Sequence, residues 1–482
     1  MEKFNYAFVF KIVPVLMNYI PVPYTELRKQ LFQGSISCLE VVESFLNRIE
    51  LNNKNLNAFL EVYGDEAKQR AKEVDNKIKS GTAGKLAGMV VGIKDLLCYE
   101  NHHSYAGSKI LNTFKSTFSA TAVQRLLDED AIIIGRQNCD EFGMGSTNEN
   151  SAYGPVLNFQ NQSKVAGGSS GGSAVAVQAD MCQVSLGTDT GGSIRMPAAF
   201  CGVAGLKPTY GKVSRWGLIA YASSFDTIGP MGKFVSDLDL VMEVIAGEDG
   251  NDSTLFETAR NYTKTQKVAY IKEIVEHSSL QPEIKNAFFD RLEQLKSLGY
   301  EVKAVDFPYL EQLLPTYYVL TTAESSSNLS RFDGVKFGHR TQNPHNLIDM
   351  YKKTRSEGFG EEVKRRIMLG TFVLSADYFD AYYTKAQKVR RLIKDYTDTI
   401  LKDCDFIISP TTSSTAYSIG EKTLDPIQMY LGDLFTVQAN VTGLPAISIP
   451  MGNDDSGMPM GFQIMGKAFD EKQIVALSKE LV

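Results

Sequence analysis

Residues 166–197 read AGGSSGGSAVAVQADMCQVSLGTDTGGSIRMP and contain two clusters rich in glycine and serine, at 167–173 and 189–193. Glycines let backbone N–H groups approach a reacting atom, and a serine in such a turn presents its hydroxyl to that atom. Upstream, Lys94 closes the apolar run MVVGI at 89–93. Lys94, Ser169 and Ser193 together suggest attack by a serine on a carbonyl carbon.

A serine hydroxyl is a poor nucleophile until a neighbouring base takes its proton. None of the five histidines lies inside either cluster, although a histidine distant in sequence could fold against them. Lysine can serve instead, because burial lowers the pKa of its ammonium, and Ser-Lys pairs are a known variant of the catalytic triad. Lys94 has the context for this role. The simpler alternative is a lysine at a strand end whose charged group reaches solvent.

The two clusters resemble the signature of the amidase signature family, and the similarity covers about residue 20 to the C-terminus. Within the family, four stretches are similar to the A-type chains of tRNA-dependent amidotransferases rather than to the stand-alone amidases: Thr354–Gly360, Val363–Ile367, Asp380–Tyr383 and Ala386–Arg390. The other stretches that carry the family resemblance are Arg136–Ser146, Gly205–Gly211 and Ser223–Pro230.

The resemblance implies a role for each member of the trio. Ser193 corresponds to the nucleophile, Ser169 to a bridging serine held after a cis peptide bond, and Lys94 to the general base. Backbone N–H groups of the second cluster would bind the oxyanion. The residues expected in this oxyanion hole are Thr190, Gly191 and Gly192.

Substrate choice needs further groups, because glutamine is a zwitterion whose selection requires a cation for the carboxylate and an anion for the amine. The resemblance assigns these roles to Arg366 and Asp433, with a hydrogen bond from Tyr317 at the rim. From the residues alone, Arg366 would be a solvated helix residue and Asp433 a surface residue.

The expected function is therefore that of the glutaminase subunit of a tRNA-dependent amidotransferase. Such a chain hydrolyses glutamine through an acyl-enzyme and passes ammonia to a B-type subunit, which amidates Glu-tRNA(Gln), Asp-tRNA(Asn) or both in a heterotrimer with a C-type subunit. The resemblance implies no cofactor or metal in this chain, with ATP and Mg²⁺ used by the partner. The net charge of −6 and the pI near 5.6 indicate that the tRNA is held mainly by the partner.

Two other function classes compete with this hypothesis. One is a stand-alone amidase that acts on another small amide. The other is a phosphate or nucleotide binder, since residues 167–173 precede a helix-like run. Walker A spacing is absent, because Gly81–Lys85 is too short and Gly202–Thr209 places a proline after the lysine.

Composition favours a cytoplasmic enzyme. The hydrophobic content of 43% over 482 residues can bury a large core, and the six cysteines are scattered without metal-ligand spacing, so we expect small buried side chains in a reducing compartment. Residues 1–20 are apolar-rich, but they are too short for a membrane span and are interrupted by Lys11 and Pro14. They also lack the small-residue cleavage site of a signal peptide, so neither is predicted. Our hypothesis is an extension outside the fold, with Met17 as an alternative start.

Short apolar runs alternate with helical patterns along the chain, which predicts an α/β fold. The family implies one large mixed β-sheet wrapped by helices in a single domain at 21–482, with about 300–400 as a helical insertion that forms a pocket wall. Ser37 and Glu40 form a capping-box pattern at the start of a helix. The expected strands are Val90–Ile93, Ile132–Ile134, Gln183–Leu186, Val268–Ile271, Phe406–Ser409 and Ala446–Ile449, and the expected helices include Thr121–Asp128, Ile284–Leu298 and Asp380–Leu401.

Overall fold

The computed structural model describes residues 21–256, 264–421 and 430–482. The extension hypothesised for residues 1–20 lies outside this range. Strands in the described residues form one 11-stranded sheet, in the order β1-β3-β2-β4-β6-β5-β10-β11-β9-β7-β8. They are β1 (Phe59–Val62), β2 (Val90–Lys94), β3 (Ile132–Gln137), β4 (Val184–Asp189), β5 (Ala204–Lys207), β6 (Thr227–Gly232), β7 (Lys267–Ile271), β8 (Glu301–Val305), β9 (Phe406–Pro410), β10 (Ala446–Asn453) and β11 (Pro459–Gly466).

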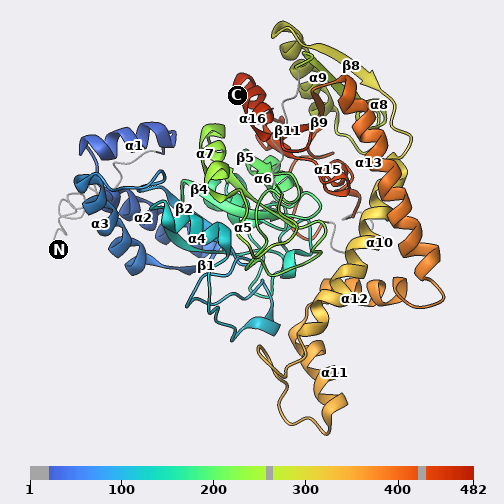
Figure 1. Ribbon diagram of the computed structural model, residues 1–482, viewed down its shortest axis with the longest axis horizontal. Coiled ribbons are helices and arrows are strands. Elements are labelled where there is room, and N and C mark those ends of the chain that lie inside the picture. The colour runs from blue at the N-terminus through green and yellow to red at the C-terminus, as the bar shows by residue number, and fades with distance from the viewer. Residues whose placement is uncertain (1–20, 257–263, 422–429) are drawn as a thin grey trace, which may run out of the picture.

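The sheet is mixed, as the family resemblance implied. Its two flanks contain parallel strands: β3, β2 and β4 on one side, and β9, β7 and β8 on the other. Between them, β6, β5, β10 and β11 pair antiparallel. Helices surround the sheet (Figure 1).

The helices pack on both flanks and at the ends of the sheet. They are α1 (Tyr24–Gln33), α2 (Cys38–Leu56), α3 (Gly64–Ser80), α4 (Thr121–Asp128), α5 (Gly171–Gln178), α6 (Arg195–Cys201), α7 (Val235–Ile245), α8 (Lys272–Val275), α9 (Pro282–Ser297), α10 (Leu310–Asn328), α11 (Leu347–Gly358), α12 (Glu361–Val373), the π-helical turn η5 (Asp380–Thr384), α13 (Lys385–Asp403), α15 (Val437–Thr442) and α16 (Glu471–Leu481). None of these described helices has both the length and the apolar character that a membrane span needs.

All six predicted strands are present, within a few residues of their predicted bounds. The capping box is also confirmed. Ser37 Oγ accepts a hydrogen bond from the Glu40 N–H at 3.2 Å, and the Glu40 carboxylate accepts one from the Ser37 N–H at 2.8 Å. The six cysteines are buried and unpaired, as expected.

The region at about 300–400 contains one element that the prediction missed. Residues 301–305 form β8, which pairs parallel with β7 at the edge of the sheet. Helices make up most of the rest of this region, and α11 projects away from the sheet (Figure 1). Helices α10 and α12 pack against each other. They carry Tyr317 and Arg366, respectively.

Candidate active site

The candidate site lies where two neighbouring parallel strands end. Lys94 is the last residue of β2, and Asp189 is the last residue of β4. Because β2 and β4 are adjacent and parallel, their carboxyl ends meet at the same edge of the sheet. The second glycine cluster follows β4 directly, so it lies next to Lys94.

Lys94 is fully buried, and its ammonium contacts hydroxyl groups only. Nζ donates to Ser169 Oγ at 2.7 Å, to Thr188 Oγ1 at 2.8 Å and to Ser170 Oγ at 2.9 Å. No carboxylate pairs with it among the described residues, and burial lowers its pKa to about 8. The three N–H donors of the charged form are all used. Loss of one proton would leave a lone pair facing one of these hydroxyls.

The first glycine cluster brings Ser169 to Lys94. The peptide bond between Gly168 and Ser169 is cis, as the resemblance implied. A Cβ at position 168 would lie 2.0 Å from the Asp140 carboxylate, so only glycine fits there. The N–H of Ser170 donates to the backbone carbonyl of Ser193 at 3.2 Å, which holds the two clusters together.

Ser193 is buried, with 9% of its surface exposed. Its hydroxyl makes no hydrogen bond within the described part of the chain, to Ser169 or to any other residue. The structure thus joins Lys94 to Ser169 directly and places Ser193 beside this pair through the backbone.

The turn that carries Ser193 is organised by Asp189. This carboxylate accepts from the Gly192 N–H at 2.8 Å and the Ile194 N–H at 3.1 Å, and it forms a buried ion pair with Arg195 at 3.0 Å. Burial raises the pKa of Asp189, but Arg195 outweighs this effect and holds the pKa well below its ordinary value. Because the Gly192 N–H is directed at Asp189, the expected oxyanion donors that remain are the N–H groups of Thr190 and Gly191.

Tyr317 contacts this turn directly, and Asp433 is linked to it through Thr436. A Cβ at Gly191 would lie 2.3 Å from Tyr317 Oη, so the tyrosine hydroxyl rests against the glycine. Thr436 donates to the Gly191 carbonyl at 2.6 Å and to the Asp433 carbonyl at 3.1 Å, which links the two segments. Two of the three predicted binding residues, Tyr317 and Asp433, therefore lie close to the predicted oxyanion turn.

Asp433 is buried and held from two sides. Its carboxylate accepts from Ser146 Oγ at 2.7 Å and from Tyr318 Oη at 2.5 Å. Burial raises its pKa to about 6, so the carboxylate stays mainly ionised at neutral pH. The expectation of a surface residue, drawn from the residues alone, is wrong: Asp433 is 7% exposed.

Arg366 is also buried, against the expectation of a solvated helix face. It is 3% exposed, and its guanidinium carbon lies 5.4–5.5 Å from the centres of the Tyr221, Tyr318 and Tyr430 rings. Tyr318 therefore touches the cation with its ring and the Asp433 anion with its hydroxyl. A buried cation and a buried anion thus both contact Tyr318, an arrangement that suits a zwitterion.

A model of the amidase family matches residues 40–475 of the chain. The chain belongs to the amidase family. The match spans both glycine clusters and Lys94, so the contact of Lys94 with Ser169 lies within the part that defines the family.

Named relatives resemble this amidase over nearly its whole length. The A chain of glutamyl-tRNA(Gln) amidotransferase from Chlorobium phaeobacteroides is 47% identical over 95% of this chain and 98% of its own. The protein of the same name from Synechococcus elongatus is 48% identical, over 93% and 95%. Among solved structures, the corresponding glutamyl-tRNA(Gln) amidotransferase chain from Thermotoga maritima is 37% identical with a TM-score of 0.75, over 95% and 92%. The peptide amidase from Stenotrophomonas maltophilia is 28% identical with a TM-score of 0.80, over 95% and 97%.

Several polar contacts of this amidase site were not predicted from the sequence. Thr188 and Ser170 reach Lys94 from β4 and from the first cluster, and Ser146 reaches Asp433 from a distant loop. Such contacts cross between segments and leave no local pattern. Glu362 is different, because it precedes Arg366 by one helical turn, and that spacing alone could have indicated a pair.

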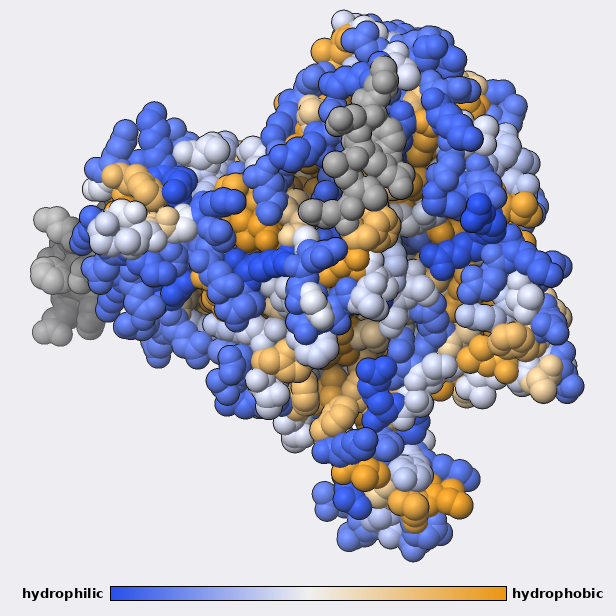
Figure 2. Space-filling model, viewed as in Figure 1, coloured by the Kyte–Doolittle hydropathy of each residue, from blue (hydrophilic) through white to orange (hydrophobic). Residues whose placement is uncertain are grey.

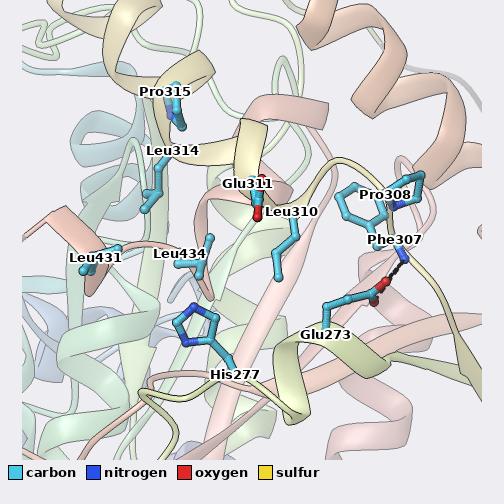
Figure 3. A pocket seen from close by; sticks show the side chains of 10 residues that line it. All are labelled: Glu273, His277, Phe307, Pro308, Leu310, Glu311, Leu314, Pro315, Leu431 and Leu434. Carbon is cyan, nitrogen blue, oxygen red and sulfur yellow. Dashed lines mark hydrogen bonds between the residues drawn. The ribbon is translucent and has the colours of Figure 1, made fainter.

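A cavity of about 630 Å³ lies outside the amidase site (Figure 3). Leu310, Leu314 and Pro315 of α10 line one side, while Leu431 and Leu434 flank Asp433 on the other. Glu273 also lines it, but its carboxylate accepts the Phe307 N–H at 3.0 Å. None of the nine predicted site residues lines this cavity, although Tyr317 and Asp433 lie on the segments that do.

Proposed function

We propose that this amidase is the glutamine-hydrolysing component of a tRNA-dependent amidotransferase, of the glutamyl-tRNA(Gln) amidotransferase type. The observation that carries the proposal is the contact between fully buried Lys94 and Ser169 beside Ser193. The relatives named as glutamyl-tRNA(Gln) amidotransferase chains support it through identities of 47–48% over nearly the whole chain.

The proposed mechanism is a two-step acyl transfer. Neutral Lys94 accepts a proton from Ser169, which accepts one from Ser193 as the Ser193 oxygen attacks the carboxamide carbon. Backbone N–H groups of Thr190 and Gly191 stabilise the oxyanion, a contribution of about 3 kcal/mol per donor in other serine enzymes. The relay returns a proton to the leaving nitrogen, ammonia departs, and water hydrolyses the glutamyl ester.

Glutamine would be held at its α-carbon end. Arg366 binds the α-carboxylate, Asp433 binds the α-ammonium, and Tyr317 donates a hydrogen bond from beside Gly191. Support comes from the burial of both charges, since a desolvated ion pair with a substrate is stronger than an exposed one.

The amide acceptor would be handled by partner subunits. We propose a heterotrimer in the cytoplasm, in which a B-type subunit binds tRNA, ATP and Mg²⁺, and a C-type subunit completes the assembly. The net charge of −6 supports a tRNA site on the partner.

The surface also supports a protein partner. Apolar side chains gather on the arm formed by α12 and η5, seen at the right of Figure 2. Met368 is 70% exposed, and the half-exposed rings of Phe372, Tyr378 and Tyr382 contact one another there. Exposed apolar patches of this kind are typical of interaction sites.

The test is Ser193→Ala in the assembled complex, assayed with glutamine and with ammonium chloride as nitrogen donors. We expect glutamine-dependent amidation of Glu-tRNA(Gln) to fall at least a thousand-fold, because the nucleophile is lost, while ammonium-dependent amidation stays near the wild-type rate. Loss of both activities would mean that the chain does more than release ammonia. Full activity of the lone chain on varied amides would favour the stand-alone amidase instead.

A further inference from the structure

Arg366 and Glu362 form a buried pair on one face of α12. Glu362 is 5% exposed, and its Oε1 accepts from Arg366 Nε at 2.8 Å. Glutamate one turn before arginine is the favourable order on a helix. Burial raises the pKa of Glu362, but Arg366 outweighs this effect and holds the pKa below its ordinary value, so the carboxylate is charged.

Two further groups fix the geometry of this pair. Tyr430 Oη donates to Glu362 Oε1 at 3.0 Å, while Arg365 binds the other oxygen of the same carboxylate. On the far side, Arg366 Nη1 donates to Tyr221 Oη at 2.8 Å. The guanidinium is thus held at Nε and at Nη1.

The chain of hydrogen bonds continues from Arg366 into the active site. Tyr221 Oη donates to Thr321 Oγ1 at 3.0 Å, and Thr321 Oγ1 donates to the Tyr317 carbonyl at 2.8 Å. Tyr317 in turn rests against Gly191. The hydrogen bonds of Tyr221 thus anchor the Nη1 side of the Arg366 guanidinium to α10.

The remaining end of the guanidinium is available to a ligand. Arg366 Nη2 has no hydrogen-bond partner within the described residues. Two guanidinium groups share the single Glu362 carboxylate, which leaves one net positive charge in the cluster. A carboxylate that approaches the Nη1–Nη2 end would neutralise this charge and meet two N–H donors.

We propose that Glu362 is a positioning residue, which fixes Arg366 with its Nη2 group free for a substrate carboxylate and thereby sets selectivity for amides that carry an α-carboxylate. This inference rests on the proposed function, since it takes glutamine as the substrate. Glu362 acts only through Arg366 and makes no contact with the reacting amide.

The experiment compares two amides that differ in one group, L-glutamine and 4-aminobutanamide, which lacks the α-carboxylate. Full-length Glu362→Gln, with any partner subunits that co-purify, should lose about ten-fold or more in kcat/KM for glutamine, mainly through KM, because a buried charged hydrogen bond is removed. The kcat/KM for 4-aminobutanamide should stay within about two-fold of wild type. Tyr430→Phe, which keeps the ring and removes one bond to Glu362, should give a smaller loss of the same kind.

Glu361→Gln is the matched control, because this neighbouring side chain on the same helix is 84% exposed and, among the residues that the structure describes, pairs with Lys364 alone. Equal losses on both amides in Glu362→Gln would assign Glu362 a structural role and overturn the proposal. The proposal would also be overturned if Glu362→Gln and Glu361→Gln had the same kcat/KM for glutamine. If wild type itself does not prefer glutamine over 4-aminobutanamide, the assignment of Arg366 fails and the proposed function fails with it. A wild-type preference that persists in Glu362→Gln overturns this proposal alone.

Discussion

Lys94 must be neutral to accept a proton, and its surroundings favour the neutral form. Burial without a carboxylate partner lowers its pKa to about 8, whereas an exposed lysine stays charged to about pH 10. Three hydroxyl groups satisfy its hydrogen bonds without adding charge. The pKa of Lys94 is therefore close to physiological pH, where its neutral form can act as a base.

This pKa predicts the pH dependence of glutamine hydrolysis. Below pH 8 the neutral fraction of Lys94 falls about ten-fold per pH unit, so kcat/KM should fall with that slope from pH 8 to pH 6 and level off above pH 8. Initial rates of ammonia release at several pH values measure this. The exposed Lys72→Ala variant should keep the wild-type profile, and Lys94→Ala should be inactive at every pH. A flat profile between pH 6 and pH 8, or an active Lys94→Ala enzyme, would remove Lys94 as the base.

Residue types and motif context were enough to single out Lys94, Ser169 and Ser193. The burial of Arg366 and Asp433 could not be predicted in the same way, because charged residues are exposed in most proteins. Their burial depends on Tyr221, Tyr318 and Tyr430, which come from three separate segments. No local sequence pattern brings these rings together.

At the scale of elements, the turn between β4 and α6 depends on the buried carboxylate of Asp189. This group bonds two backbone N–H groups of the turn, pairs with Arg195, and accepts from Asn440 Nδ2 at 2.8 Å. A buried cation that loses its counter-ion is costly, typically by about 3 kcal/mol or more. The same carboxylate therefore stabilises the buried Arg195 and positions the turn that carries Ser193.

Asp189→Asn should therefore lower the free energy of unfolding by about 3 kcal/mol and reduce glutamine hydrolysis sharply. Urea unfolding followed by circular dichroism, together with initial rates, measures both effects. Asp180→Asn serves as the control, since Asp180 pairs with Lys233 in a partly exposed bridge and should cost less than about 1 kcal/mol. Unchanged stability in Asp189→Asn would show that the turn is held by other contacts.

Strands with a clear apolar run were predictable, whereas strands broken up by proline or by charged residues were missed. Strand β2 begins with an apolar run and reads VVGIK. By contrast, β6 reads TIGPMG, β11 begins with Pro459 and β8 reads EVKAV. Proline and glycine argue against a central strand, yet Pro230 lies opposite Leu186 within the sheet. Tertiary pairing thus overrides local preference in these strands.

At the scale of the whole molecule, the mixed sheet brings together residues from distant parts of the chain. Lys94, Ser169 and Ser193 lie on one flank, while Arg366 and Asp433 arrive from segments more than 150 residues later. The family resemblance predicted this assembly; periodicity alone would have indicated only an α/β fold.

The proposed heterotrimer predicts that the chain assembles with partner subunits in its native cell. When the chain is expressed with an affinity tag in its native cell, it should co-purify with two further subunits. The purified complex should bind tRNA, whereas the acidic chain alone should not. Mass spectrometry of the purified material and a filter-binding assay at fixed salt measure these outcomes. Recovery of a lone chain from the native cell would contradict the proposed heterotrimer.

The central claim is that Ser193 carries the acyl group. The most direct measurement is peptide mapping by mass spectrometry after acid quench of the wild-type enzyme during turnover of glutamine. The account predicts a glutamyl ester on Ser193, and none on the corresponding peptide of Ser193→Ala. A glutamyl group on Ser169 or on any other residue, or steady turnover with no ester at all, would contradict it.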